Sequence, residues 1–130
     1  MNAVTDSGTS KPAAGPFRGL PRSQRITRSG QFSEAYDRGR CFRGRLLTMW
    51  LSAGPDAALR LGVVTGRRVG EAVARVRARR LMREAFRLNR SRFRGGVDVV
   101  LSARSDICRA GMHDVEAELL ALAKKAGILR

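Results

Sequence analysis

Residue types that support several common protein chemistries are scarce in this chain of 130 residues. Its two cysteines, Cys41 and Cys108, cannot form the disulfide framework of a small secreted protein and lack the CxxC spacing of a zinc site. The single histidine, His113, leaves few ways to build a Ser–His–Asp or Cys–His catalytic set. Residues 66–70, GRRVG, lack the Gly-Lys-Ser/Thr of a phosphate-binding loop, and no DxD-type carboxylate cluster suggests a two-metal nuclease site. The residue types therefore favour binding over self-contained catalysis.

Long apolar runs are also absent from the sequence. No run approaches the ~18 residues of a membrane-spanning helix, and residues 1–20 contain no continuous apolar segment of a secretory signal. We therefore expect no membrane partner and a reducing, cytoplasmic setting. Hydrophobic residues still make up 43% of the chain, which excludes a wholly disordered basic tail. The length fits one domain, which we place at residues 20–127, after a flexible tail over residues 1–19.

Positive charge is the most abundant chemical feature. Lys and Arg number 26 against 11 Asp and Glu, for a net charge of +15. Residues 18–45 and 60–94 hold most of the arginines, whereas residues 95–130 are neutral overall. Charge concentrated in this way indicates a polyanion-binding protein, with an acidic protein or an anionic lipid as alternative partners. Arginine suits RNA because its planar fork meets phosphates and stacks on bases, although a GC-rich genome also favours arginine codons.

Hydrophobic periodicity and turn residues predict three helices and three strands. The predicted helices cover residues 29–38, 71–90 and 112–126, and the predicted strands cover residues 45–53, 59–65 and 97–103. The GPD sequence at residues 54–56 predicts a turn that joins the first two strands as a hairpin. In the first strand, alternation should direct Leu47, Met49 and Leu51 toward the core.

Three aromatic residues are candidates for contact with nucleotides. Phe32 and Tyr36 stand four residues apart and share one face of the first predicted helix. They belong either to the core or to a surface that stacks on bases beside the neighbouring arginines. Trp50 shares the more polar face of its strand with Thr48, where it either forms a binding surface or lies under a helix.

The helix predicted over residues 71–90 has two contrasting sides. Its apolar side should pack on the sheet and consists of Ala74, Ala78, Leu81, Met82, Ala85 and Leu88. Its opposite side carries Arg79, Arg80, Arg83 and Arg87, with Arg75 and Arg77 at the borders. An ordinary solvated face usually mixes charges of both signs, whereas this row of guanidinium groups can meet successive phosphates. The helix over residues 112–126 is amphipathic and is interpreted as structural.

The order of residues over 60–86 resembles the signature of the bacterial ribonuclease P protein subunit. In that family a strand is followed by a basic pair and Gly, then by a helix with Arg-x-Arg-x-x-Arg and Leu-x-Arg-x-Ala-Phe. Here the residues that match are Arg67, Arg68, Gly70, Ala72, Val73, Arg75, Arg77, Arg79, Arg80, Leu81, Arg83, Ala85 and Phe86. The resemblance extends over roughly residues 20–125, with further matches at Phe32, Tyr36, Gly39, Arg45, Asp98, Ala103 and Arg104.

The resemblance implies a fold, a partner and an activity. The implied fold is α+β, a two-layer α-β sandwich of order αβββαβα, whose four-stranded sheet includes a short strand near residues 41–43 and a left-handed βαβ crossover. The implied activity is the removal of 5′ leaders from precursor tRNA by a ribonucleoprotein. In that complex the RNA subunit holds the catalytic Mg²⁺ ions and performs the hydrolysis, so we expect no catalytic residue on the protein. No obligate protein partner is evident.

The resemblance also assigns two sets of site residues. The residues implied to dock on the RNA subunit are Arg67, Arg68, Arg75, Arg77, Arg79, Arg80 and Arg83. The residues implied to line a cleft for the single-stranded leader, between the first helix and the sheet, are Phe32, Tyr36, Thr48 and Trp50. It assigns no metal ligand on the protein.

Two positions depart from the family pattern, and two other functions remain possible. Glu71 and Val76 stand where the family usually has Asn, and both changes should weaken RNA contact locally. One alternative is a non-catalytic RNA-binding module of the same fold, such as a ribosome-associated protein or an RNA chaperone. The other is a binder of double-stranded DNA, which is less favoured because the basic helix needs its other face for the core.

Overall fold

The computed structural model describes residues 24–26, 39–53 and 57–130. The strands in these ranges are β1 (Arg40–Arg43), β2 (Leu47–Ala53), β3 (Leu61–Val64) and β4 (Val97–Ala103). The α-helices are α2 (Ala72–Asn89) and α3 (Met112–Ala126), with short 3-10 helices η2 (Arg67–Val69), η3 (Arg90–Arg92) and η4 (Ser105–Arg109). The order βββαβα is the one implied to follow the first helix. That helix, over residues 29–38, lies outside the described residues, as do the tail and the turn over residues 54–56.

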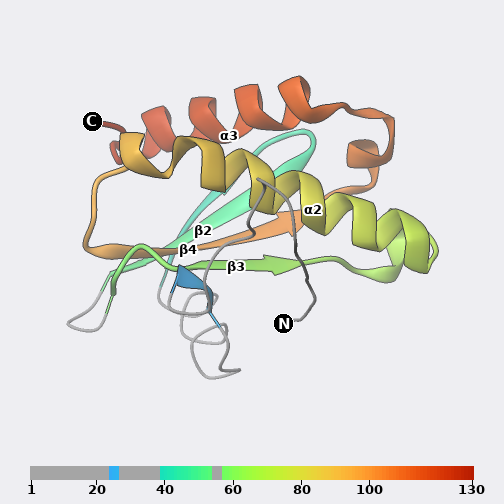
Figure 1. Cartoon of the computed structure of the whole chain (residues 1–130), viewed down its shortest axis with the longest axis horizontal. Coiled ribbons are helices and arrows are strands. Elements are labelled where there is room, and N and C mark those ends of the chain that lie inside the picture. Colours follow the sequence, from blue (N-terminus) through green and yellow to red (C-terminus); the bar gives the residue numbers. More distant parts are fainter. Residues whose placement is uncertain (1–23, 27–38, 54–56) are drawn as a thin grey trace, which may run out of the picture.

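The four strands form one mixed sheet in the order β1-β2-β4-β3. β2 pairs antiparallel with β1 and with β4, and β3 pairs parallel with β4. The hairpin predicted to join residues 45–53 and 59–65, which are now β2 and β3, is therefore wrong, because β4 lies between these strands (Figure 1). Val99, Val100 and Leu101 of β4 are all fully buried, and a strand that is apolar on both faces is stable only in the interior of a sheet. A parallel pair needs a long crossover, which α2 supplies between β3 and β4.

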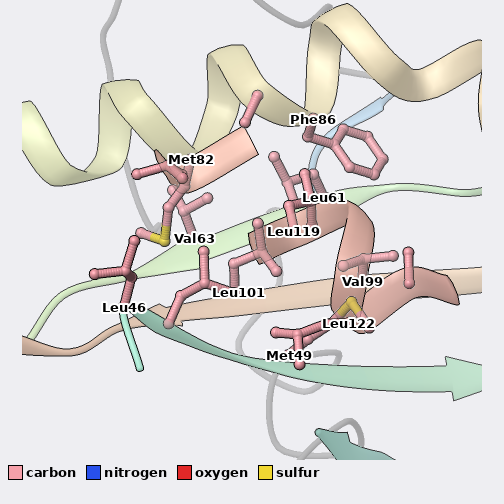
Figure 2. Close-up of a cluster of buried hydrophobic side chains, with 14 of the residues drawn as sticks. Leu46, Met49, Leu61, Val63, Met82, Phe86, Val99, Leu101, Leu119 and Leu122 are labelled. Atoms are coloured by element: carbon pink, nitrogen blue, oxygen red, sulfur yellow. The ribbon is translucent and has the colours of Figure 1, made fainter. Parts of the chain in front are cut away.

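Helices α2 and α3 lie side by side on one face of the sheet and form the second layer of an α+β sandwich (Figure 1). The core fills the space between the layers, as Figure 2 shows. Leu47, Met49 and Leu51 are at most 3% exposed, so the predicted alternation in β2 is confirmed. The core side chains labelled in Figure 2 are Leu46, Met49, Leu61, Val63, Met82, Phe86, Val99, Leu101, Leu119 and Leu122.

The buried side of α2 differs in part from its prediction. Ala78, Met82 and Ala85 are buried as expected. Leu88, however, is 52% exposed, whereas Phe86 and Asn89 are buried in its place. The cause is that α2 packs against α3 as well as against the sheet: Asn89 Nδ2 donates to Glu116 Oε2 at 2.7 Å. Because α2 contacts α3 as well as the sheet, its buried side includes Asn89 and leaves Leu88 exposed.

The turn between β1 and β2 is fixed by a carboxylate from the helical layer. Glu118 of α3 accepts hydrogen bonds from the backbone N–H groups of Arg45, Leu46 and Leu47, at 2.7–3.1 Å. A Cβ at Gly44 would collide with this carboxylate, so a larger residue there would displace it from these hydrogen bonds. This contact fixes the start of β2 relative to α3.

Candidate nucleic-acid interface

Arg67 and Arg68 lie in η2, on the connection between β3 and α2, and both side chains are exposed. Val69 follows them and is buried, so the segment is anchored to the core. Gly70 then adopts a φ of 141°, in the region that favours glycine, and its N–H donates to the carbonyl of Arg67. Sequence and backbone together place this arginine pair at the N-terminal end of α2.

Along α2 the predicted arginine row includes residues that have no described partner. Arg80 is exposed and Arg75 is half-buried, and neither side chain forms a hydrogen bond or ion pair with another described residue. Five positions separate them, so they lie about 7.5 Å apart along the helix axis and about 140° apart around it. Arg83, half-buried, points between these two directions and differs from them in that its side chain is engaged in a contact of its own. These guanidinium groups are held on a rigid element at a spacing suited to contact with a phosphate backbone.

Two further arginines of the predicted row are engaged with acceptors inside the protein. Arg79 Nη1 donates to Thr65 Oγ1 at 2.7 Å, which ties α2 to the end of β3. Arg77 donates through Nη2 to the carbonyl of Ala110 at 2.7 Å and through Nη1 to that of Ile107 at 3.5 Å. Arg77 therefore links α2 to η4.

The η4 segment in turn supports η2. Cys108 donates from Sγ to the carbonyl of Val69 at 2.7 Å, and the two 3-10 helices are in contact. Arg109 is exposed in η4, on the same end of the molecule as Arg67 and Arg68. Sequence reasoning did not single out Arg109, because its part of the chain is neutral overall and no pattern marks it.

Acidic and apolar side chains limit the extent of the basic surface. Glu84 binds Arg87 at 2.7 Å, and this hydrogen bond raises the pKa of the Arg87 guanidinium. Arg87 is therefore paired within the helix. Toward the N-terminal end, Val73 is 83% exposed and Val76 is 38% exposed. The surface of α2 is thus a mixture of arginines and exposed valines rather than a uniformly basic stripe.

Thr48 and Trp50 lie together on the other face of the sheet, away from α2 and α3. Trp50 is half-buried and packs against a small apolar cluster of Ile26 and Val100, which also contacts Val64. Trp50 therefore does not lie beneath α2 or α3, and the helix predicted over residues 29–38 lies outside the described residues. Thr48 is only 7% exposed. Phe32 and Tyr36 lie outside the described residues.

The geometry thus separates two predicted surfaces. One comprises the arginines of η2 and α2 on the helical layer, and the other is the outer face of the sheet with Trp50. Comparison with known proteins identifies the family to which the chain belongs. The family model described as Ribonuclease P matches residues 20–127. This chain belongs to the ribonuclease P protein family.

Individual relatives agree with this assignment. The ribonuclease P protein component of Clostridium botulinum (strain Loch Maree) is 34% identical over 108 residues, which cover 82% of this chain and 97% of that one. The component of Chloroflexus aggregans is 36% identical over 111 residues, which cover 85% of this chain and 82% of that one. Membership of this family gives the chain the role of the protein subunit of a tRNA-processing ribonucleoprotein, which implies an RNA subunit as its partner.

Solved structures of this family share the fold. The ribonuclease P protein of Thermotoga maritima superposes with a TM-score of 0.70 at 26% identity, covering 78% of this chain and 96% of that one. The protein of Staphylococcus aureus gives a TM-score of 0.74 at 22% identity, covering 82% and 98%. The α+β sandwich implied by the sequence resemblance is therefore confirmed. Within the described ranges, no helix is long and apolar enough to span a membrane.

Proposed function

We propose that this subunit promotes removal of the 5′ leader from precursor tRNA by binding two RNAs on its two layers. The RNA subunit would dock on the arginines of η2 and α2. The single-stranded leader would lie on the outer face of the sheet beside Trp50. The observation that carries the proposal is the separation of these surfaces: the docking arginines lie on the helical layer, whereas Trp50 lies on the opposite face of the sheet.

The docking surface would act mainly through charge. Each arginine that meets a phosphate releases condensed counterions, so the logarithm of the binding constant falls with the logarithm of salt concentration by about 0.7–0.9 per contact. Arg67, Arg68, Arg75 and Arg80 are the best suited to this role, because they carry charge that no described carboxylate neutralises. Positive charge between two RNAs also reduces their mutual repulsion, which would lower the Mg²⁺ concentration required for cleavage.

Leader binding would depend on stacking. Unpaired bases stack on aromatic rings with a gain of about 1–3 kcal/mol per base. Trp50 is held in a fixed position by the neighbouring side chains of Ile26 and Val100. Phe32 and Tyr36 are proposed to complete this surface by their match to the family pattern. Thr48 would contribute mainly through its position, because its side chain is buried.

The hydrolysis would take place on the RNA subunit, where bound Mg²⁺ would activate the attacking water and stabilise the leaving oxygen. Among the described residues, no three His, Cys, Asp or Glu side chains gather as a metal site. This chain's own residues bind and orient the two RNAs.

The deciding experiment measures cleavage of precursor tRNA at low Mg²⁺ concentration by the RNA subunit of the same organism, with and without this protein. We expect stimulation of correct 5′ cleavage, and no cleavage by the protein alone. Arg75→Gln/Arg80→Gln should weaken binding to the RNA subunit and reduce its salt dependence. Trp50→Ala should preserve that binding but lower the preference of the complex for precursor over mature tRNA.

The control for Trp50→Ala is Trp50→Phe, which keeps an aromatic ring and should retain most of the preference for precursor tRNA. Tight, salt-sensitive RNA binding without any stimulation of cleavage would overturn the proposal. That result would indicate an RNA-binding module that has kept the fold and lost the enzymatic role.

A further inference from the structure

A second group of arginines lies at the opposite end of α2 from the docking surface. η3 follows α2 directly, and the chain from Arg92 to Arg94 pairs with the C-terminal residues. Arg130 N donates to the carbonyl of Arg92 at 2.8 Å, and Arg94 N donates to the carbonyl of Ile128 at 2.7 Å. An antiparallel bridge between Phe93 and Leu129 lies between these bonds. We call Arg92, Arg94 and Arg130 the distal arginine cluster.

The backbone of this cluster is fixed by the core. Phe93 is 1% exposed and meets Phe86 edge-to-face, with ring centroids 5.3 Å apart. Its buried ring anchors the segment, while Arg92 and Arg94 on either side of it are exposed, as is Arg130. Three arginines from two distant parts of the sequence are thereby held next to one another on a rigid support.

The charge of the cluster is not neutralised by described residues. None of its three members forms an ion pair with a described carboxylate. Arg92 Nη1 is oriented by Asn89 Oδ1 at 3.4 Å, and Arg130 Nε donates to the carbonyl of Phe93 at 3.2 Å. The side chain of Arg94 has no hydrogen-bonding partner among the described residues. Like charges in neighbouring positions across paired strands destabilise a fold, so this arrangement is unfavourable for the protein by itself.

The space beside the cluster is open. Arg94 is followed by Gly95 and Gly96, and at neither glycine would a Cβ meet a described atom within 4 Å. Gly96 has a φ of 84°, which favours glycine and turns the chain into β4. A polyanion can therefore approach the backbone and the arginine side chains together. In the sequence this Arg-Gly-Gly is a single copy of a motif that is weak by itself, and the structure gives it two arginine neighbours.

We propose that the distal arginine cluster is a second contact for the phosphate backbone of the RNA subunit. This inference rests on the proposed function, since it assumes that the RNA subunit docks on the N-terminal half of α2. The 18-residue helix separates the two contacts by about 27 Å. The cluster belongs to the end of the helical layer where the C-terminus lies (Figure 1), rather than to the outer face of the sheet proposed for the leader. A single RNA touching both ends of α2 would fix the orientation of the protein on it, which one contact cannot do.

The test measures binding of the full chain to the RNA subunit of the same organism across a series of salt concentrations. Arg92→Gln/Arg94→Gln should lower the affinity roughly tenfold and reduce the salt-dependence slope by about 1.4–1.8, as expected for two lost phosphate contacts. Arg92→Lys/Arg94→Lys keeps the charge and should retain most of the slope. The matched control is Lys124→Gln/Lys125→Gln, which removes the same charge from two exposed residues in the last turn of α3.

Several outcomes would overturn the inference. Arg92→Gln/Arg94→Gln could bind the RNA subunit as the wild type does. It could also lose no more affinity than Lys124→Gln/Lys125→Gln, which would show an effect of net charge alone. A loss seen only with leader-bearing precursor tRNA in the assembled complex would assign the cluster to the substrate instead. Arg94→Glu alone keeps the test decisive if the double variant is poorly folded, because the Arg94 side chain supports no described contact.

The failure of this inference is distinguishable from that of the proposed function. If the wild-type protein neither binds the RNA subunit nor stimulates cleavage, the proposed function itself is wrong, and this inference with it. If the wild type does both and the variants of the cluster match it, only the second contact is wrong.

Discussion

The two sides of helix α2 differ in how closely the role of each residue follows from the sequence pattern. On the buried side, each position is determined by packing against the sheet and α3, and the buried residues follow a helical period. On the outward side, arginines that look equivalent in the sequence have different roles. Arg77 and Arg79 bind acceptors within the protein, whereas Arg75 and Arg80 have no described partner. A basic motif in an RNA-binding protein therefore cannot be equated with a set of RNA contacts, because some of its members stabilise the surface that the others present.

The largest expected effect tests where the buried side ends. Phe86 is fully buried, whereas Leu88, two residues later, is 52% exposed. Phe86→Ala should lower the free energy of unfolding by about 3–5 kcal/mol, because it leaves a cavity and removes the contact with Phe93. Leu88→Ala should change it by less than about 0.5 kcal/mol. Urea denaturation of both variants measures the difference, and a large loss for Leu88→Ala would contradict the described packing of α2.

A smaller effect separates the two kinds of arginine on the outward side. Arg77→Ala should lower the free energy of unfolding by about 1–2 kcal/mol, because the carbonyl of the buried residue Ala110 loses the donor described for it. Arg80→Ala should leave the stability within about 0.5 kcal/mol of the wild type. It should instead reduce the salt dependence of binding to the RNA subunit by about 0.8, for one phosphate contact.

Equal stability of the two alanine variants would contradict the different roles given to Arg77 and Arg80. If Arg77→Ala is as stable as Arg80→Ala, then the contact with η4 contributes little, and Arg77 is better assigned to the RNA. Arg77→Lys is the matched variant, since it keeps the charge but cannot reproduce the two-point contact of a guanidinium group. It should recover RNA affinity only as far as it recovers stability.

Local patterns in the sequence predicted β2, β3, β4, α2 and α3, but they did not predict how the strands pair. The bounds of β4 and α3 are as predicted, since Gly96 precedes β4 and Gly111 and Gly127 flank α3. Insertion of β4 between β2 and β3 could not be predicted from periodicity, because strand pairing depends on contacts between distant residues. The same holds for Arg77, whose acceptors are 30 and 33 positions away along the chain.

The candidate site was predictable to a similar degree. Alternation placed Trp50 on the face away from the predicted core, and the structure confirms that position. It gave no sign that Thr48 is 7% exposed, because the burial depends on the flanking strands, which place Arg43 and Ser102 opposite Thr48. The distal arginine cluster could not be predicted, since Arg92 and Arg130 meet only when the C-terminus folds back on η3.

The smallest expected effect concerns a valine on the outward side of α2. Val76 replaces the Asn usual in the family and is 38% exposed between two arginines of the motif. Valine and asparagine have similar helix propensities, so Val76→Asn should leave the stability within about 0.5 kcal/mol. An amide at this position can donate to phosphate or ribose oxygens, and one such bond should raise the affinity for the RNA subunit by about three- to tenfold.

The control for Val76→Asn is Val73→Asn, at a position that is 83% exposed and already matches the family. It should leave the affinity unchanged, because the gain expected at position 76 depends on that position lying within the Arg-x-Arg of the motif. A loss of affinity in Val76→Asn would instead mean that the valine methyl groups themselves contact the RNA. The outward side of α2 would then recognise its partner through apolar contact as well as charge, and the departure from the family pattern would be an adaptation to the RNA of the same organism.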